Sequence, residues 1–256
     1  MAYQLRRQRW KYWLGMAACA IAAGVTTEPT AQTSTPVSLS QAEIFLELNH
    51  TDGDLGLHAA IDGQPWKSIE VEGPGDSLLL SLSSRGRLVP HGLTQLAFES
   101  AEPSFDELPP ARFFRRFPEG RYEIDAQALD GTEMEGVATL SHILAAPPGN
   151  ILVSGLPAAE NCDATLPQVR PPVRIEWDPV TSSHPDIGKK GPVTIEKYQF
   201  FVEGAGVNLS LDLPPTITSV DLPELITNLG KAFKFEIIAR TTRGNNTAVE
   251  TCFTLF

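Results

Sequence analysis

The strongest alternation of hydrophobic and polar positions in the chain lies between Gly230 and Gly244. Apolar residues occupy every second position there, and most positions between them are charged, in the order Phe233, Lys234, Phe235, Glu236, Ile237, Ile238, Ala239 and Arg240. Side chains of a strand point alternately to its two faces, so one face of this segment is apolar. A strand with one apolar and one charged face is typical of a sandwich or another half-buried sheet.

Shorter apolar runs recur from residue 41 to the end of the chain, and they predict an all-β fold. The predicted strands cover residues 42–48, 54–61, 66–71, 77–83, 93–99 and 136–143, and then 151–153, 173–180, 198–203, 216–220 and 249–255. Asp62-Gly63 stands between two of these runs and predicts a tight hairpin. The 20 glycines and 21 prolines suit the many turns of an all-β protein.

One segment of the first half departs from the strand pattern. Ser104 and Glu107 form a capping box, which is typical of a helix start. Pro109 and Pro110 limit that start to a short turn, and a second helical piece can begin at Pro110 because proline fits the first helical turn. We therefore expect one short helical crossover, with phenylalanines of residues 113–117 packed inward.

The segment from Gly230 to Gly244 resembles the sixth strand of a fibronectin type III domain. Phe233 stands where that family has a tyrosine whose hydroxyl closes a corner, so this corner bond is not available here. Upstream, residues 173–180 with Trp177 resemble the family's second strand, and residues 198–203 its third. The order and spacing of these motifs cover most of residues 150–256.

A second segment, Phe117 to Ile124, resembles the same corner-plus-strand pattern and has its tyrosine, Tyr122. The resemblance implies two β-sandwich domains in tandem, over residues 41–146 and 147–256. The first is also similar to a group of uncharacterised exported bacterial proteins that pair such a domain with a fibronectin-like one. Ala145–Gly149, with two prolines, is the expected short and stiff linker.

The N-terminus predicts a signal peptide over residues 1–31, followed by a polar linker over 32–40. Four basic residues precede an uncharged apolar stretch, Trp13 to Val25, which is too short for a comfortable membrane span. Arg6-Arg7 leaves twin-arginine export open beside ordinary secretion, and Cys19 leaves lipid anchoring open. We expect an exported protein, periplasmic or extracellular, with no membrane span after signal removal.

Charge narrows the possible partners. Without residues 1–31 the chain keeps 16 Lys and Arg against 30 Asp and Glu, a net charge of −14. Nucleic acids and anionic membrane surfaces both attract basic patches, so neither is an expected partner. An acidic surface also keeps an exported protein soluble, which is the simplest interpretation.

Cys162 and Cys252 are the cysteines that remain after signal removal, and export places them in oxidising surroundings. Cys252 falls in the last predicted strand, and Cys162 in the loop after the first strand of the second domain. In a fibronectin-like sandwich these strands can lie close together. The sequence therefore predicts a disulfide between them, with two free thiols as the alternative.

The sequence indicates no catalytic residues, no cofactor and no metal ligands. It contains no nucleophile elbow, no catalytic-cysteine signature and no phosphate-cradling glycine loop. The histidines fall in separate segments without zinc-binding spacing, and they are His50, His58, His91, His142 and His184. Half-buried, hydrogen-bonded side chains are the expected state of His58 and His142, which lie in strand runs.

One loop suggests a cation. Asp52 and Asp54 flank Gly53, and calcium prefers carboxylate and carbonyl oxygens on such flexible loops. The other ligands of a full calcium loop are absent from the sequence around them. Aspartate and glycine are also favoured in turns for backbone reasons alone, so a solvated turn is the competing interpretation.

These observations favour a non-catalytic binding, adaptor or spacer protein of the bacterial envelope, with a protein or a glycan as its partner. The alternative is an accessory or degraded hydrolase acting on polysaccharide or peptide. Exposed aromatic side chains on one sandwich face would favour sugar binding. A deep pocket with carboxylates of shifted pKa would favour the enzyme.

Overall fold

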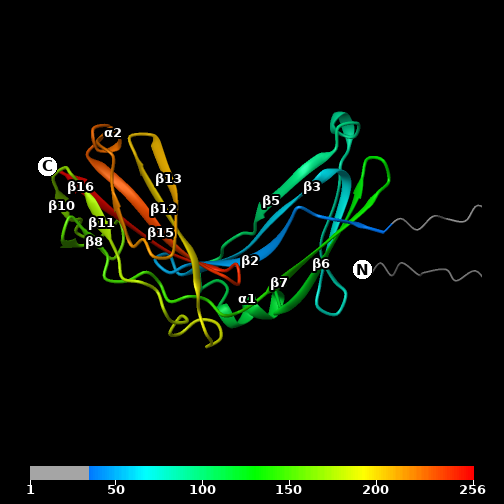
Figure 1. The fold of residues 1–256 in the computed structure, drawn as a ribbon. Helices are drawn as coiled ribbons and strands as arrows, with labels where there is room; N and C mark the ends of the chain where they lie inside the picture. The colour runs from blue at the N-terminus through cyan, green and yellow to red at the C-terminus, as the bar shows by residue number, and fades with distance from the viewer. Residues whose placement is uncertain (1–34) are drawn as a thin grey trace, which may run out of the picture. The chain divides into compact units, whose positions relative to one another are not determined.

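The structure is a computed structural model that describes residues 35–256, and it shows an all-β protein with two short α-helices (Figure 1). The prediction of an all-β fold is thereby confirmed. The predicted signal peptide and the first residues of the predicted polar linker lie outside the described residues. Within residues 35–256, no helix has the length and apolar character needed to cross a membrane.

The chain as far as Leu144 surrounds one hydrophobic core, which we call the first core. Its elements are β1 (Val37–Ser38), β2 (Gln41–Asn49), β3 (Asp54–Gly73), β4 (Ser77–Ser83), the 3-10 turn Gly86–Leu88, β5 (Leu93–Glu99), α1 (Pro110–Arg116), β6 (Gly120–Ala128) and β7 (Glu133–Leu140). The strand order is β1-β7-β6-β3-β2, and β4 and β5 also pair with β3. Alternate side chains of β2 and β6 are buried, as their apolar spacing requires.

The long strand β3 corrects one prediction. The hairpin expected at Asp62-Gly63 is absent, because β3 runs through these residues as one strand of 20 residues. Its first part pairs with β2 and β5, whereas its second part pairs with β6 and β4. Gly63 allows close packing instead of a turn, since a Cβ there would lie 2.8 Å from Leu39 Cδ2. The pairing with β5 shifts between Asp62 and Trp66, so a bulge carries the strand from one set of partners to the other.

The predicted corner before β6 is confirmed. The hydroxyl of Tyr122 donates a hydrogen bond to the carbonyl of Pro118, with an O–O distance of 3.0 Å. The ring of Tyr122 is buried in the first core, and burial raises the pKa of its phenol to about 12. Just before the corner, α1 begins at Pro110 and buries Phe113, as the proline and phenylalanine pattern predicts.

The remaining chain surrounds a second core. Its elements are β8 (Leu152–Val153), β9 (Leu156–Pro157), β10 (Gln168–Val169), β11 (Arg174–Glu176), β12 (Ile195–Gly204), β13 (Val207–Leu213), β14 (Ser219–Asp221), α2 (Glu224–Thr227), β15 (Ala232–Thr241) and β16 (Asn246–Leu255). A small sheet has the order β14-β11-β8-β9, and β16, β15, β12 and β13 form the opposing layer.

β15 is the strand predicted from the alternating pattern. Phe233, Phe235, Ile237 and Ala239 are all at most 2% exposed. The ring of Phe200 stacks on Phe235 and also on Trp177, which directly follows β11. These aromatic side chains fill the second core at the place where the fibronectin resemblance expects a buried tryptophan.

Strand pairing joins the two cores. β16 pairs in parallel with β2, and Figure 1 shows these strands side by side where the blue and red ends of the colour range meet. The buried side chain of Asn245 reinforces this junction. Its Oδ1 accepts from the Leu46 backbone N–H (2.9 Å), and its Nδ2 donates to the carbonyls of Ser141 (2.7 Å) and Ile143 (3.0 Å).

The segment expected to be a linker is packed into this junction. Ala145 is fully buried, and its carbonyl accepts from the Thr247 hydroxyl (3.0 Å). The loop that precedes β12 also crosses over, because Lys189 N–H donates to the His142 carbonyl (2.8 Å) and Ile187 packs on the first core. The division into domains 41–146 and 147–256 stays a prediction.

Candidate functional site

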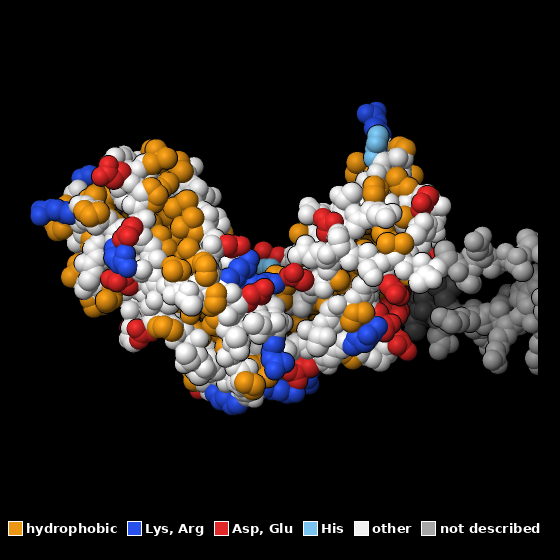
Figure 2. All heavy atoms as spheres, in the orientation of Figure 1, with side chains coloured by type: hydrophobic (Ala, Val, Ile, Leu, Met, Phe, Trp, Pro, Cys, Tyr) orange, Lys and Arg blue, Asp and Glu red, His pale blue; other side chains and the backbone are white. Residues whose placement is uncertain are grey.

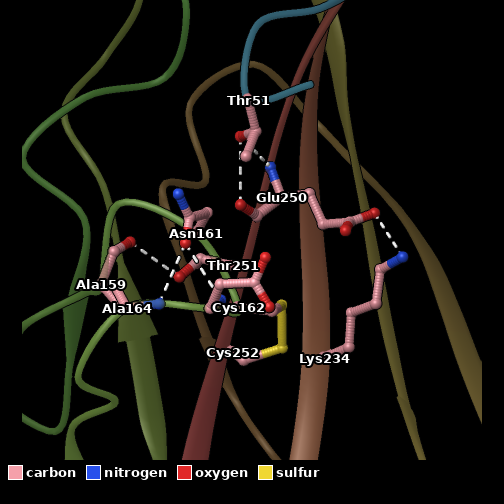
Figure 3. Close-up of a disulfide and its surroundings, with 10 residues drawn as sticks. Thr51, Ala159, Asn161, Cys162, Ala164, Lys234, Glu250, Thr251 and Cys252 are labelled. Atoms are coloured by element: carbon pink, nitrogen blue, oxygen red, sulfur yellow. Dashed lines mark hydrogen bonds and ion pairs between the residues drawn. A yellow bond between two sulfur atoms is a disulfide. The ribbon is translucent and has the colours of Figure 1, made fainter.

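Cys162 and Cys252 are joined by a disulfide, with their Cα atoms 4.9 Å apart (Figure 3). Cys252 lies in β16, and Cys162 lies in the loop between β9 and β10. The Thr251 hydroxyl fastens the same loop by donating to the Ala159 carbonyl (2.7 Å). The bridge spans 90 residues of sequence, so it ties the start of the second core to its last strand.

Five carboxylates lie close enough to couple electrostatically. Four are on β2, β3, β15 and β16 and one follows β5, and we call them the acidic face: Glu47, Asp54, Glu102, Glu236 and Glu250. Glu236 and Glu250 are directly opposite each other in the β15–β16 pair. Glu47 lies opposite Asn246 in the β16–β2 pair, so the acids extend across the junction. In Figure 2, acidic, basic and histidine side chains gather in the middle of the view, near the place where Figure 1 labels β2.

Two carboxylates of the acidic face have strongly raised pKa values, because they are partly buried and lie close to other acids. Burial raises the pKa of Glu236 to about 7, and the charges of Glu47 and Glu250 add to this effect while Lys234 opposes it. Burial likewise raises the pKa of Asp54 to about 6, with Glu102 as the largest neighbouring charge. The Oδ1 atom of Asp54 is buried and makes no hydrogen bond within the described part of the chain. Ionised carboxylates held in this way lower the stability of the folded state.

The basic groups on this side are already paired. Lys234 lies beside Glu250 (Nζ–Oε2 2.5 Å), and this ion pair borders the disulfide, because Lys234 is opposite Cys252 in the β15–β16 pair. Arg240 pairs with Glu43 (2.5 Å) and stacks over the ring of Phe45. Among residues 35–256, neither Glu236 nor Asp54 forms an ion pair with a basic side chain.

Only one of the two aspartates of the predicted calcium loop lies in the acidic face. Asp54 belongs to the acidic face, and the Asp52 charge contributes to its raised pKa. The Asp52 carboxylate accepts from the Asn49 side chain (3.0 Å), as it would in a simple turn. In the described part of the chain, these two aspartates belong to no group of three metal-ligating side chains. Calcium binding by this loop stays a prediction.

A different group of potential ligands lies at the edge of the acidic face. His58, Glu99 and Glu102 each bring one ligand atom, and the three atoms lie within 4.8 Å of one another. His58 Nε2 is 3.1 Å from Glu102 Oε1. Sequence spacing did not identify this group, because 41 positions separate the histidine from the first glutamate. The pairing of β3 with β5 brings His58 opposite Glu99, and this pairing would have to be known to find the group.

The other buried histidines are satisfied by hydrogen bonds. His142 Nε2 lies 2.7 Å from the Phe117 carbonyl, in agreement with the expectation for this residue. His184 is 2% exposed, and its Nδ1 accepts from the backbone N–H groups of Asp186 (3.2 Å) and Ile187 (3.0 Å). Its Nε2 therefore carries the proton and donates to His50 Nδ1 (3.3 Å). Burial is the main cause that lowers the pKa of His184.

The hollows and the exposed aromatic side chains help to distinguish a glycan-binding protein from a hydrolase. The hollow that borders Glu236 and Glu250 has a volume of about 230 Å³ and is open to solvent. This is smaller than the ~300–1,000 Å³ usual for small-molecule pockets. Among the described residues, Phe256 is the exposed aromatic side chain, and Trp66 and Trp177 are buried. A row of aromatics for stacking on sugars is therefore not formed by residues 35–256.

Comparison with known proteins identifies no family. No family model matches the chain, and no curated protein sequence matches it. Similar solved structures include the human OSCAR ligand-binding domain, with 12% identity and a TM-score of 0.26 over 83% of this chain and 97% of that chain. A two-domain fibronectin type III segment from chicken tenascin has 12% identity and a TM-score of 0.28 over 84% of this chain and 98% of that chain. A tetra-tandem repeat in the extending region of a large adhesion protein has 13% identity and a TM-score of 0.27 over 84% of this chain and 50% of that chain. Similarity at this level carries no argument about function.

Proposed function

We propose that the chain is an exported, non-catalytic binding or adaptor protein of the bacterial envelope, and that it binds a positively charged partner at the acidic face. The observation that carries this proposal is the excess of carboxylates there. Glu236 and Asp54 have raised pKa values and form no ion pair with a basic side chain of residues 35–256, so they lower stability in the free protein. A cationic group of a protein or an amino-bearing glycan would offset this repulsion on binding.

Two features support export. The basic, apolar and polar order of residues 1–40 is that of a signal peptide. The Cys162–Cys252 disulfide suits an oxidising compartment such as the periplasm or the cell exterior. Sequencing the N-terminus of protein from the cell envelope tests this part, and an intact Met1 would contradict it.

The hollow that residues 35–256 form at the acidic face is small and open, which favours binding over turnover. Glu236 and Glu250 border an open hollow, where solvent would compete with substrate. The raised carboxylate pKa values are the observation that favours the second candidate, an accessory or degraded hydrolase. Release of reducing ends or of peptide from isolated envelope material, abolished by Glu236→Gln, would support that candidate.

Affinity capture from envelope extracts tests the binding proposal. The mature protein is the bait. The double variant Glu236→Gln/Glu250→Gln is compared with Glu133→Gln, which removes an exposed carboxylate of β7 that does not belong to the acidic face. We expect a partner that the wild type and Glu133→Gln retain, that the double variant loses, and that salt releases. Equal capture by all three proteins would contradict binding at this face.

A further inference from the structure

We propose that His58, Glu99 and Glu102 form a binding site for a divalent first-row transition metal ion of the zinc class. This site is distinct from the predicted calcium loop. The inference does not depend on the proposed envelope partner. It rests on how the fold brings the three side chains together, on a backbone position that makes room for them, and on the chemistry of the ligand set.

The strands fix two of the ligands. His58 of β3 and Glu99 of β5 are directly opposite each other in an antiparallel pair, so both side chains leave the same face. The ring of His58 stacks on Phe45 with centroids 5.3 Å apart, and Arg240 covers the same phenylalanine. The imidazole is therefore held in place before any ion binds.

The chain after β5 turns back to supply the third ligand. Ser100 makes this return, because its N–H donates to the Leu57 carbonyl and its hydroxyl accepts from the Leu57 N–H, both at 2.9 Å. Two residues later the Glu102 carboxylate lies above Gly56. A Cβ at Gly56 would overlap that carboxylate and stand 2.9 Å from His58 Nε2. Because position 56 is a glycine, there is space for the Glu102 carboxylate to lie beside the His58 imidazole.

The distances suit one ion. A metal about 2.1 Å from both His58 Nε2 and Glu102 Oε1 would see these atoms at an angle of about 95°, given their 3.1 Å separation. The three ligand atoms lie within 4.8 Å of one another, and an ion at ~2.1 Å from each needs them within about 4.2 Å. Glu99 is exposed, so its carboxylate has room to rotate toward the other two ligand atoms.

The ligand types select the metal. Imidazole nitrogen with two carboxylate oxygens suits zinc and its first-row neighbours, whereas calcium takes oxygen ligands in larger number. Three protein ligands leave at least one position for water or for a group from a partner. The surrounding charge also favours a cation, because Glu47 and Asp54 lie close enough to couple electrostatically with Glu102.

Titration of the purified mature protein with Zn²⁺, followed by calorimetry, is the first test. We expect one ion per chain, and at least tenfold weaker binding in His58→Gln and in Glu102→Gln. Glu99→Gln should also weaken binding and provides a variant at an exposed position that leaves the fold intact. Gly56→Ala keeps every ligand but displaces the Glu102 carboxylate, so it too should weaken binding.

Three controls separate this site from diffuse attraction to acids. Glu133→Gln and His91→Gln each remove one exposed group outside the site and should leave the dissociation constant within twofold, whereas Glu236→Gln removes a charge that couples to Glu102 and should weaken binding much less than the loss of a ligand does. Co²⁺ gives a spectroscopic readout, because its visible absorption should appear in the wild type and be lost in His58→Gln. An equal concentration of Ca²⁺ should not displace Zn²⁺.

Two results would overturn the inference. One is the absence of stoichiometric Zn²⁺ binding by the wild type. The other is equal binding by the wild type, His58→Gln and Glu99→Gln, which would assign the ion to other groups. Neither result bears on partner capture at the acidic face, so this inference and the proposed function fail separately.

Discussion

Replacing Glu236 with glutamine should stabilise the protein at alkaline pH and have little effect at acidic pH. Glutamine has nearly the shape of protonated glutamate, but it cannot ionise. The side chain lies on β15 opposite Glu250, and burial raises the pKa of its carboxyl to about 7 from the ordinary 4.5. Folding therefore opposes ionisation of this group.

The magnitude follows from these two pKa values. Their difference corresponds to about 3 kcal/mol of unfavourable free energy for the ionised carboxylate in the folded state. Partial exposure to water reduces this figure, and we expect Glu236→Gln to raise the free energy of unfolding by about 1–2 kcal/mol at pH 8.

The raised pKa of Glu236 determines how its contribution to stability changes with pH. The folded protein holds this proton more tightly than the unfolded chain, so the cost is complete above pH 7 and declines as the pH falls toward 4.5. The advantage of Glu236→Gln over the wild type should decline over the same range and nearly vanish at pH 4.5.

Urea unfolding of both proteins at pH 8 and pH 4.5 measures this difference directly. Glu133→Gln, at an exposed position of β7, is the matched control and should show no gain at pH 8. A Glu236→Gln protein that is less stable than the wild type at pH 8 would refute the reasoning. Such a result would mean that the ionised carboxylate has a stabilising partner.

Three further predictions concern stability elsewhere in the described chain. Thiol titration of the unfolded, unreduced protein should find no free thiol from Cys162 or Cys252, and replacing both with serine should lower the free energy of unfolding by about 4 kcal/mol; two free thiols per chain would contradict the bridge. Asn245→Ala should cost about 3 kcal/mol in urea unfolding because it leaves two buried backbone groups and one partly buried carbonyl without a partner, whereas Asn208→Ala at an exposed position should change little. NMR titration should find the pKa of His184 below 6.5, so this residue contributes a loss of stability as the pH falls below 6.5 toward that lower value; a pKa at or above 6.5 would contradict the burial of a neutral imidazole at this position.

The sequence predicts features that depend on local periodicity. The alternation around Phe235 identifies β15, and the position of Tyr122 identifies the corner before β6. In both cases the information lies within a few neighbouring residues, because strand faces and corners are set by residues close in sequence. Pro110 likewise marks the first turn of α1.

Features set by long-range contacts are not predicted. Asp62-Gly63 has the composition of a hairpin turn, but the glycine is needed because Leu39 packs against it from another part of the chain. Asn245 follows a glycine and has the character of a turn residue, yet its side chain bonds to backbone groups 102 to 199 positions away. Sequence patterns read within a window of neighbouring residues do not carry such contacts.

The acidic face shows the same division between composition and position. The sequence gives a net excess of acids, and dispersed over a surface they would only favour solubility. The pairing of β2 with β16 instead sets Glu47 beside the strands that carry Glu236 and Glu250. Of the nearby bases, Lys234 is paired with Glu250 and Arg240 with Glu43. Repulsion of this kind is relieved when a cation is bound, and it would decline in the free protein if one carboxylate were neutral. A metal ion at His58, Glu99 and Glu102 would therefore lower the pKa of Asp54 and Glu236 as well as bind its own ligands, so bound zinc should reduce the stabilisation that Glu236→Gln gives at pH 8.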